Sequence, residues 1–221
     1  MEIYMSKFIQ IPILKNIDEM DSVACLPINQ YNWGGDYRPE VYGRVAYIKS
    51  HGFLVQFQCY ESTVSCQYTE DADPVYLDSA VEFFLQIPFL SNANPSEPYF
   101  NVPYFNIEMN SNGAILAGFG PGKENRHPLD LMEIKQIKRQ VSWNAAHDCW
   151  EASILLPVSI ISHYIPINGQ DLIPDTRIRF QLYKIAEGDL LTHFASLGPI
   201  ESPVPNFHLS SYFVDGILTL P

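Results

Sequence analysis

A strict alternation of side-chain character over residues 76–110 is the feature that most constrains how this chain can fold. In residues 79–85 most odd-numbered positions are apolar, whereas the even-numbered positions include Glu82. In residues 104–110 the odd-numbered positions are apolar, and the even-numbered positions carry Glu108 among amide and aromatic side chains. A period of two places successive side chains on opposite faces of a β-strand. The pattern therefore predicts two strands, each with one apolar and one polar face.

The polar side of these strands allows two interpretations. A sheet needs to bury only one face, so a face that carries Glu82 and Glu108 is either solvated surface or a prepared polar site. A third segment of this kind, residues 177–183, alternates arginine, glutamine and tyrosine with apolar residues near the C-terminus. These residues predict a second polar strand face.

Similar alternation recurs along the chain and predicts the fold class. The 13 Tyr and 13 Phe suit a pleated surface, and the 17 Pro argue against long helices. Residues 158–164 are the best candidate for one or two helical turns, and no linker or repeat divides the 221 residues. We therefore expect an all-β, antiparallel β-sandwich of the jelly-roll kind, with at most one or two short helices, in a single domain spanning residues 1–221.

Three segments are less clear. Residues 1–32 predict an edge strand followed by a covering loop, and residues 64–68 could add a further strand. Residues 130–141 fit a short helix and a strand about equally well, so both remain open.

The chain is acidic, which excludes some classes of partner. It has 25 Asp+Glu against 13 Lys+Arg, a formal net charge of −12. Because binding to phosphate depends on clustered cations, we expect neither nucleic acid nor an anionic membrane surface as a partner. The surplus acid could hold calcium, although solubility is the simpler explanation. The 4 cysteines lack zinc-site spacing, and no other cofactor is predicted.

The first residues lack the long apolar run of a signal peptide, and no stretch approaches the ~20 apolar residues of a membrane span. The sequence alone therefore predicts a cytoplasmic protein, or an extracellular one if an export signal has been removed.

Eight short motifs follow one another in a distinctive order. They are Trp33, RPEVYGRVAY from Arg38, DSAVEFF from Asp78, YFNIEMNSNG from Tyr104, the W-x-A-x-I-x-x-P of residues 150–157, RFQLYK from Arg179, THF from Thr192 and PNFH from Pro205. Together they resemble the family 9-like carbohydrate-binding modules that are often attached to xylanases. The resemblance covers most of the chain from Trp33 onward.

The resemblance implies a non-catalytic, DOMON-like β-sandwich that holds an oligosaccharide or polysaccharide of the xylan or glucan class. In such modules a sugar end lies between two aromatic rings, with carboxylate, amide and arginine groups around its hydroxyls. It also implies association with glycoside hydrolases. The positions that match the family's sugar-binding residues are Tyr76, Glu82, Glu108, Asn110, Arg179, Gln181 and Tyr183.

Two features of the resemblance leave questions open. Leu197 stands where relatives carry Trp after the HF pair, so a second aromatic wall is uncertain. Some relatives bind structural calcium, for which Asp71, Asp73 and Asp78 are the candidate ligands here.

Two other functions remain as alternatives. A sandwich that has lost its sugar site would be a scaffold or protein-interaction domain. A glycoside hydrolase would use Glu82 and Glu108 as its pair of carboxyl groups, one acting as acid and the other as nucleophile or base.

Overall fold

The computed structural model describes residues 8–88, 101–144, 146, 148–167, 172–188 and 191–221. These residues form one curled 14-stranded sheet. Its strands are β1 (Ile9–Leu14), β2 (Leu26–Pro27), β3 (Gln30–Gly34), β4 (Glu40–Ile48), β5 (Gly52–Tyr60), β6 (Ala80–Gln86), β7 (Tyr104–Asn110), β8 (Ile115–Gly120), β9 (His127–Pro128), β10 (Lys138–Asn144), β11 (Cys149–Pro157), β12 (Arg177–Ala186), β13 (His193–Ser196) and β14 (Val214–Thr219).

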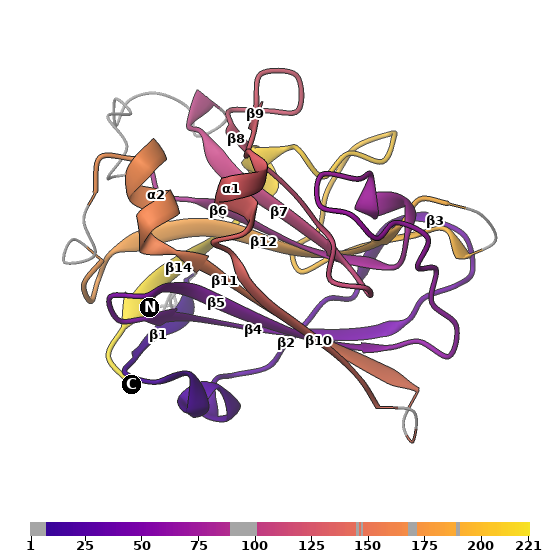
Figure 1. Ribbon diagram of the computed structural model, residues 1–221, viewed down its shortest axis with the longest axis horizontal. Helices are drawn as coiled ribbons and strands as arrows, with labels where there is room; N and C mark the ends of the chain where they lie inside the picture. Colours follow the sequence, from indigo (N-terminus) through magenta and orange to yellow (C-terminus); the bar gives the residue numbers. More distant parts are fainter. Residues whose placement is uncertain (1–7, 89–100, 145, 147, 168–171, 189–190) are drawn as a thin grey trace, which may run out of the picture.

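The sheet folds on itself into two layers, as predicted for an all-β sandwich. One layer has the order β10-β11-β5-β4, and the other has the order β14-β12-β6-β7-β8-β9 (Figure 1). Strand β1 joins them, because Ile9 to Pro12 pair with β14 whereas Ile13 and Leu14 pair with β4. Both pairings of β1 are parallel, and the other pairings among the described strands are antiparallel. The prediction of an edge strand in residues 1–32 is therefore wrong for β1.

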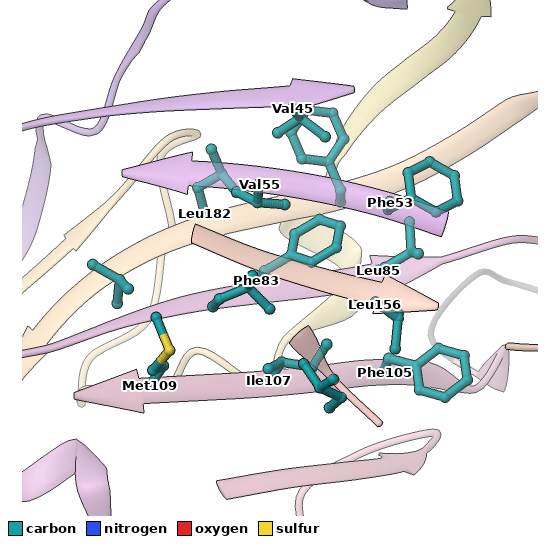
Figure 2. Packing of buried hydrophobic residues seen from close by; sticks show 14 of the residues in the cluster. Val45, Phe53, Val55, Phe83, Leu85, Phe105, Ile107, Met109, Leu156 and Leu182 are labelled. Carbon is teal, nitrogen blue, oxygen red and sulfur yellow. The ribbon is translucent and has the colours of Figure 1, made fainter. Parts of the chain in front are cut away.

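The core lies between the two layers, where the apolar faces of the strands meet. Phe83, Leu85 and Ile107 come from one layer and Phe53 and Val55 from the other, and Figure 2 shows their side chains facing the same interior. Each is essentially inaccessible to solvent. Burying a side chain of this size contributes about 1.5–3 kcal/mol. The alternation in residues 79–85 and 104–110 thus identified the core faces correctly.

Two short helices cover one end of the sandwich. Helix α1 (Leu131–Ile134) is capped by Asp130, whose side chain accepts hydrogen bonds of 2.8 Å from the backbone N–H groups of Met132 and Glu133. Helix α2 (Val158–Tyr164) begins after Pro157, as predicted. Residues 130–141 therefore contain both a helical turn and the start of β10. No described helix has the length and apolar character required to cross a membrane.

A segment without strands covers the outer faces of β6, β7 and β12, on the side away from the core. This covering segment, residues 197–213, includes the 3-10 turn η5 (Ser210–Tyr212). Its Ile200, Phe207 and Phe213 pack with Phe84 and Tyr183 of the sheet in a second apolar cluster. The polar strand face predicted from the sequence is consequently not an ordinary solvated surface.

Candidate functional site

A pocket with a volume of ≈ 120 Å³ lies between the outer sheet face, the covering segment and the loop that joins β8 to β9. The sheet supplies Glu82 and Glu108, and the 3-10 turn η2 (Val75–Leu77) supplies Tyr76. The remaining lining residues are Lys123, Arg126, Ile185, Glu187, Phe194, Pro205, Asn206, Phe207 and His208. A pocket of this size, with aromatic walls and a few charged groups, can hold a single small polar ligand.

Glu82 and Glu108 are directly opposed on the paired strands β6 and β7. Each side chain is 3% exposed, and each lines the pocket. Glu108 Oε1 accepts a hydrogen bond of 3.0 Å from Asn106 Nδ2 and lies 3.6 Å from Arg126 Nη1. The carboxyl group of Glu82 has no hydrogen-bond or ion-pair partner in the described part of the chain. A nearly buried carboxyl group without a partner is unusual, because burial without compensation is costly.

The two carboxyl groups hold their protons more tightly than ordinary glutamates. Burial raises the pKa of Glu82 well above its usual value, and the neighbouring Glu108 raises it further. Burial also raises the pKa of Glu108, to about 7, against the opposing effects of Arg126 and of the Asn106 hydrogen bond. These raised pKa values favour a proton held by the pair of carboxyl groups at neutral pH. A protonated Glu82 can both donate and accept a hydrogen bond.

A polar chain of three side chains forms another wall. Arg126 Nη1 lies 2.9 Å from His208 Nε2, and His208 Nδ1 lies 2.9 Å from the Tyr104 hydroxyl. Because a guanidinium can only donate, Nε2 accepts, and Nδ1 carries the proton and donates to Tyr104. Burial, followed by the charge of Arg126, lowers the pKa of His208 to about 3. His208 is therefore neutral and orients Arg126 toward Glu108.

The aromatic side of the pocket is rigid. Phe207 stacks on Tyr183 with ring centroids 4.0 Å apart and an interplanar angle of 14°. The Tyr183 hydroxyl donates a 2.9 Å hydrogen bond to the backbone carbonyl of Phe207. Trp33 packs on Phe207 from another side at 6.0 Å, and its Nε1 donates to the Ser202 carbonyl at 2.7 Å. These contacts fix Phe207 against the pocket.

Leu197 does not determine whether the pocket has aromatic walls. It packs against the core between the layers, and its backbone N–H donates to the Leu182 carbonyl. The aromatic groups at the pocket are Tyr76, Phe194 and Phe207.

The structure brings together three of the seven predicted sugar-binding residues. Tyr76, Glu82 and Glu108 line the pocket, whereas Asn110, Arg179, Gln181 and Tyr183 do not.

Asn110 closes the turn between β7 and β8. Its Nδ2 donates to the Tyr68 carbonyl and to Asp78, and its Oδ1 accepts from the backbone N–H groups of Asn112 and Ala114. Its amide group therefore stabilises this turn and joins it to residues 68 and 78, which is a structural role.

Arg179 and Gln181 hold the covering segment in place. Arg179 donates to the carbonyl groups of Ser210 and Phe213 at 2.8 Å, and it pairs with Asp215 at 3.2 Å. Gln181 Nε2 donates to the Tyr212 carbonyl at 3.1 Å, and its Oε1 accepts from the Gly198 N–H at 3.0 Å. Both residues lie on the same outer sheet face as Glu82, but the covering segment separates them from the pocket. Tyr183 is separated in the same way, behind the ring of Phe207.

Several pocket residues had not been predicted as ligands. Lys123 and Arg126 come from a glycine-rich loop that gave no recognisable binding pattern, and Glu187 follows the end of β12. Phe194, Phe207 and His208 lie within the THF and PNFH motifs, which were the available signal.

Two of the three candidate calcium ligands, Asp71 and Asp78, are engaged by other residues of the protein. Asp78 accepts hydrogen bonds of 2.9 Å from the N–H groups of Gln67 and Tyr68 and one of 3.0 Å from Asn110. The backbone N–H groups of Gln67 and Tyr68 are therefore bound to Asp78. Residues 64–68, for which the sequence allowed a strand, form none. Asp71 pairs with Arg139 at 2.8 Å. Among the described residues, no group of three or more His, Cys, Asp or Glu side chains is arranged to hold a metal ion.

Comparison with protein families gives one match that spans nearly the whole chain. The family described as carbohydrate-binding family 9 matches residues 12–220. No curated protein matches the sequence.

Three solved structures with the same fold can be compared with this chain. A structure from Bacteroides uniformis, named as a candidate carbohydrate-binding protein, has a TM-score of 0.76 and 22% identity, covering 95% of this chain and 98% of its own. A family 9 carbohydrate-binding module from Caldicellulosiruptor kristjanssonii in complex with glucose has a TM-score of 0.65 and 11% identity, with 96% of each chain covered. A module from the same organism in complex with cellotriose has a TM-score of 0.64 and 11% identity, covering 96% of this chain and 94% of its own.

Proposed function

The chain belongs to carbohydrate-binding family 9, a family of non-catalytic sugar-binding modules, and we propose that it holds one sugar unit, or the end of an oligosaccharide, in the pocket lined by Glu82 and Glu108. The observation that carries this proposal is the partnerless carboxyl group of Glu82, which is 3% exposed and lines a pocket with aromatic walls. A ligand hydroxyl would supply the missing hydrogen bond.

The pocket has the two kinds of group that a sugar requires. The apolar C–H face of a sugar ring packs on an aromatic plane, and Tyr76 and Phe207 offer such planes. Its hydroxyl groups need donors and acceptors, which Glu82, Glu108 and Asn206 provide. Charge-assisted hydrogen bonds from Arg126 would add to the affinity.

We propose a ligand of the glucan or xylan class. Structures with the same fold were solved in complex with glucose and with cellotriose, which supports a glucose-like ring as the ligand. The pocket volume of ≈ 120 Å³ favours one ring or a chain end over several enclosed rings, because pockets for larger ligands start at about 300 Å³. As a single domain over residues 1–221, the module would work beside glycoside hydrolases that act on the same polysaccharide.

Calorimetric titration with glucose, xylose, cellobiose and xylobiose tests the proposal. We expect saturable binding that Tyr76→Ala and Glu82→Ala each weaken about tenfold or more, because each removes a direct contact with the sugar. Tyr60→Ala and Glu151→Ala are matched controls, since both residues are exposed and lie outside the pocket. No heat with any of these sugars would reject the proposal and favour the scaffold alternative.

One observation favours testing catalysis as a second function. Opposed carboxyl groups with one raised pKa are what a glycoside hydrolase uses. Incubation with aryl glycosides checks it directly: we expect no turnover, and turnover abolished by Glu82→Gln would make the protein an enzyme.

A further inference from the structure

More acidic than basic side chains line the pocket. Three carboxyl groups line it, from Glu82, Glu108 and Glu187, and two cationic side chains, from Lys123 and Arg126. His208, whose pKa is lowered to about 3, also lines the pocket and is neutral. The carboxyl groups therefore outnumber the cationic groups by one.

Among the described residues neither Glu82 nor Glu187 has an ion-pair partner, but Glu187 is exposed to solvent, so the buried unmatched group is Glu82. Glu108 has Arg126 at 3.6 Å and Asn106 at 3.0 Å, whereas no described residue bonds to the Glu82 carboxyl. Arg126 is also bound to His208 at 2.9 Å, which holds it on the Glu108 side. Glu82 is nevertheless 3% exposed, on a strand directly opposed to that of Glu108. Directly opposed side chains have Cβ atoms about 5 Å apart, so the two carboxyl groups can reach a common ligand group.

A positive charge must compensate this carboxyl group whenever it ionises in the pocket. In the free protein a bound proton does so, as its raised pKa indicates. In a complex, a ligand cation placed beside Glu82 and Glu108 could replace that proton.

We propose that the pocket prefers an amino sugar, with glucosamine as the simplest example, over the corresponding neutral sugar, and that the ligand's ammonium group lies beside Glu82. This inference rests on the proposed sugar-binding function of the same pocket. An ammonium group has three N–H donors, enough to serve both opposed carboxyl groups. The nearby faces of Tyr76 and Phe207 also attract a cation.

The number of protons is conserved when an amino sugar binds. The neutral Glu82 carboxyl group binds the protonated amine, becomes a carboxylate paired with it, and releases one proton to solvent. Binding of a neutral sugar releases none.

Calorimetric titration with glucosamine, glucose and N-acetylglucosamine at a pH where the free amine is charged tests this preference. We expect glucosamine to bind on the order of tenfold more tightly than glucose. N-acetylglucosamine has the substituent without the charge and should show no such gain. Repeating the titration in buffers of different ionisation enthalpy should show release of about one proton with glucosamine.

The variant Glu82→Gln separates charge from shape. Glutamine has the shape of a neutral carboxyl group but cannot ionise, so we expect Glu82→Gln to lose both the preference for glucosamine over glucose, measured as a ratio of affinities on the same variant, and the proton release. Glu151→Gln, at an exposed position outside the pocket, should change neither.

The outcomes distinguish this inference from the proposed function. Glucose bound as tightly as glucosamine, or a preference that survives Glu82→Gln, would overturn the amino-sugar preference and leave sugar binding intact. Proton release is measured on the wild type, so it tests the preference even if the variant folds poorly. Absence of binding to all three sugars would instead reject the proposed function.

Discussion

Lys184 Nζ lies 3.2 Å from Glu61 Oε1, and both side chains are completely buried. Lys184 extends from β12 on the side opposite the pocket, and Glu61 follows β5 in the other layer. Trp150 Nε1 donates to Glu61 Oε2 at 2.7 Å, and Lys184 donates to His193 Nε2 at 2.9 Å. A network of charged and polar groups therefore ties the two layers together inside the sandwich.

The first prediction concerns this network. We expect Lys184→Met to lower the free energy of unfolding by about 3–5 kcal/mol, because it leaves the Glu61 carboxylate buried without a counterion. Urea denaturation measures the change. The double variant Glu61→Leu/Lys184→Met should be less destabilised than the sum of the two single changes, since it leaves no unpaired charge. Additive losses would contradict the pairing.

The second prediction concerns Arg126, the cation beside Glu108. We expect Arg126→Ala to weaken sugar binding about tenfold, because His208 and Glu108 both lose a partner that shapes the pocket. The pKa of His208 should rise, because the charge of Arg126 lowers it now. Proton NMR titration and calorimetry check the two effects separately.

Arg38→Ala is the matched control for this change, because Arg38 is exposed and lies outside the pocket. An unchanged pKa of His208 in Arg126→Ala would show that the two side chains are not in contact.

The third prediction concerns the dependence of stability on pH. The folded-state pKa values of Glu82 and Glu108 lie above the ordinary value of 4.5, so between these pH values the folded state binds more protons than the unfolded state. The acid pair therefore costs stability progressively as the pH rises from about 4.5 through about 7. We expect Glu82→Gln to be more stable than the wild type at pH 8, with a smaller difference at pH 5. Denaturation of both proteins at the two pH values measures it.

The buried histidines make stability fall as the pH drops, which is the opposite dependence. They are present in both the wild type and Glu82→Gln. The pKa values of His193 and His208 are lowered to about 3, so stability falls as the pH drops below the ordinary value of 6.5. Subtracting the two denaturation curves removes this contribution. A difference that does not change with pH would contradict the raised pKa of Glu82.

The fourth prediction concerns calcium. Asp78 accepts hydrogen bonds from Ser65, Gln67, Tyr68 and Asn110, so we expect Asp78→Ala to destabilise the fold by about 3 kcal/mol or more. Because N–H donors already occupy its oxygens, a calcium chelator should leave the Tm of the wild type unchanged.

Thermal unfolding with calcium and with the chelator makes this comparison. Asp73→Ala, a change in the same region, should have a small effect, since the Asp73 side chain accepts one exposed hydrogen bond, from the Glu70 N–H. A Tm raised by calcium in the wild type and not in Asp78→Ala would instead support a structural calcium site.

The sequence predicted individual residues of the pocket better than it predicted which distant segments meet there. Tyr76, Glu82 and Glu108 were identified because each position follows from a local pattern and from motif spacing, and all three line the pocket. Arg126 and His208 were missed as ligands, since their proximity at 2.9 Å brings together segments 82 residues apart. Asn110 was assigned to the ligand, although its side chain bonds to its own turn and to Tyr68 and Asp78.

Alternation by itself determined which side chains face the core, because the two-residue period is a property of each strand's backbone alone. It therefore indicated an all-β class and placed Glu82, Glu108 and Arg179 each on the face of its own strand that is turned away from the core. Only the tertiary structure decided which of these polar groups stay open to a ligand. The covering segment lies across this face, and its carbonyl groups accept hydrogen bonds from Arg179. Glu82 is left without a described partner. That outcome depends on contacts between segments distant in sequence, which no local pattern encodes.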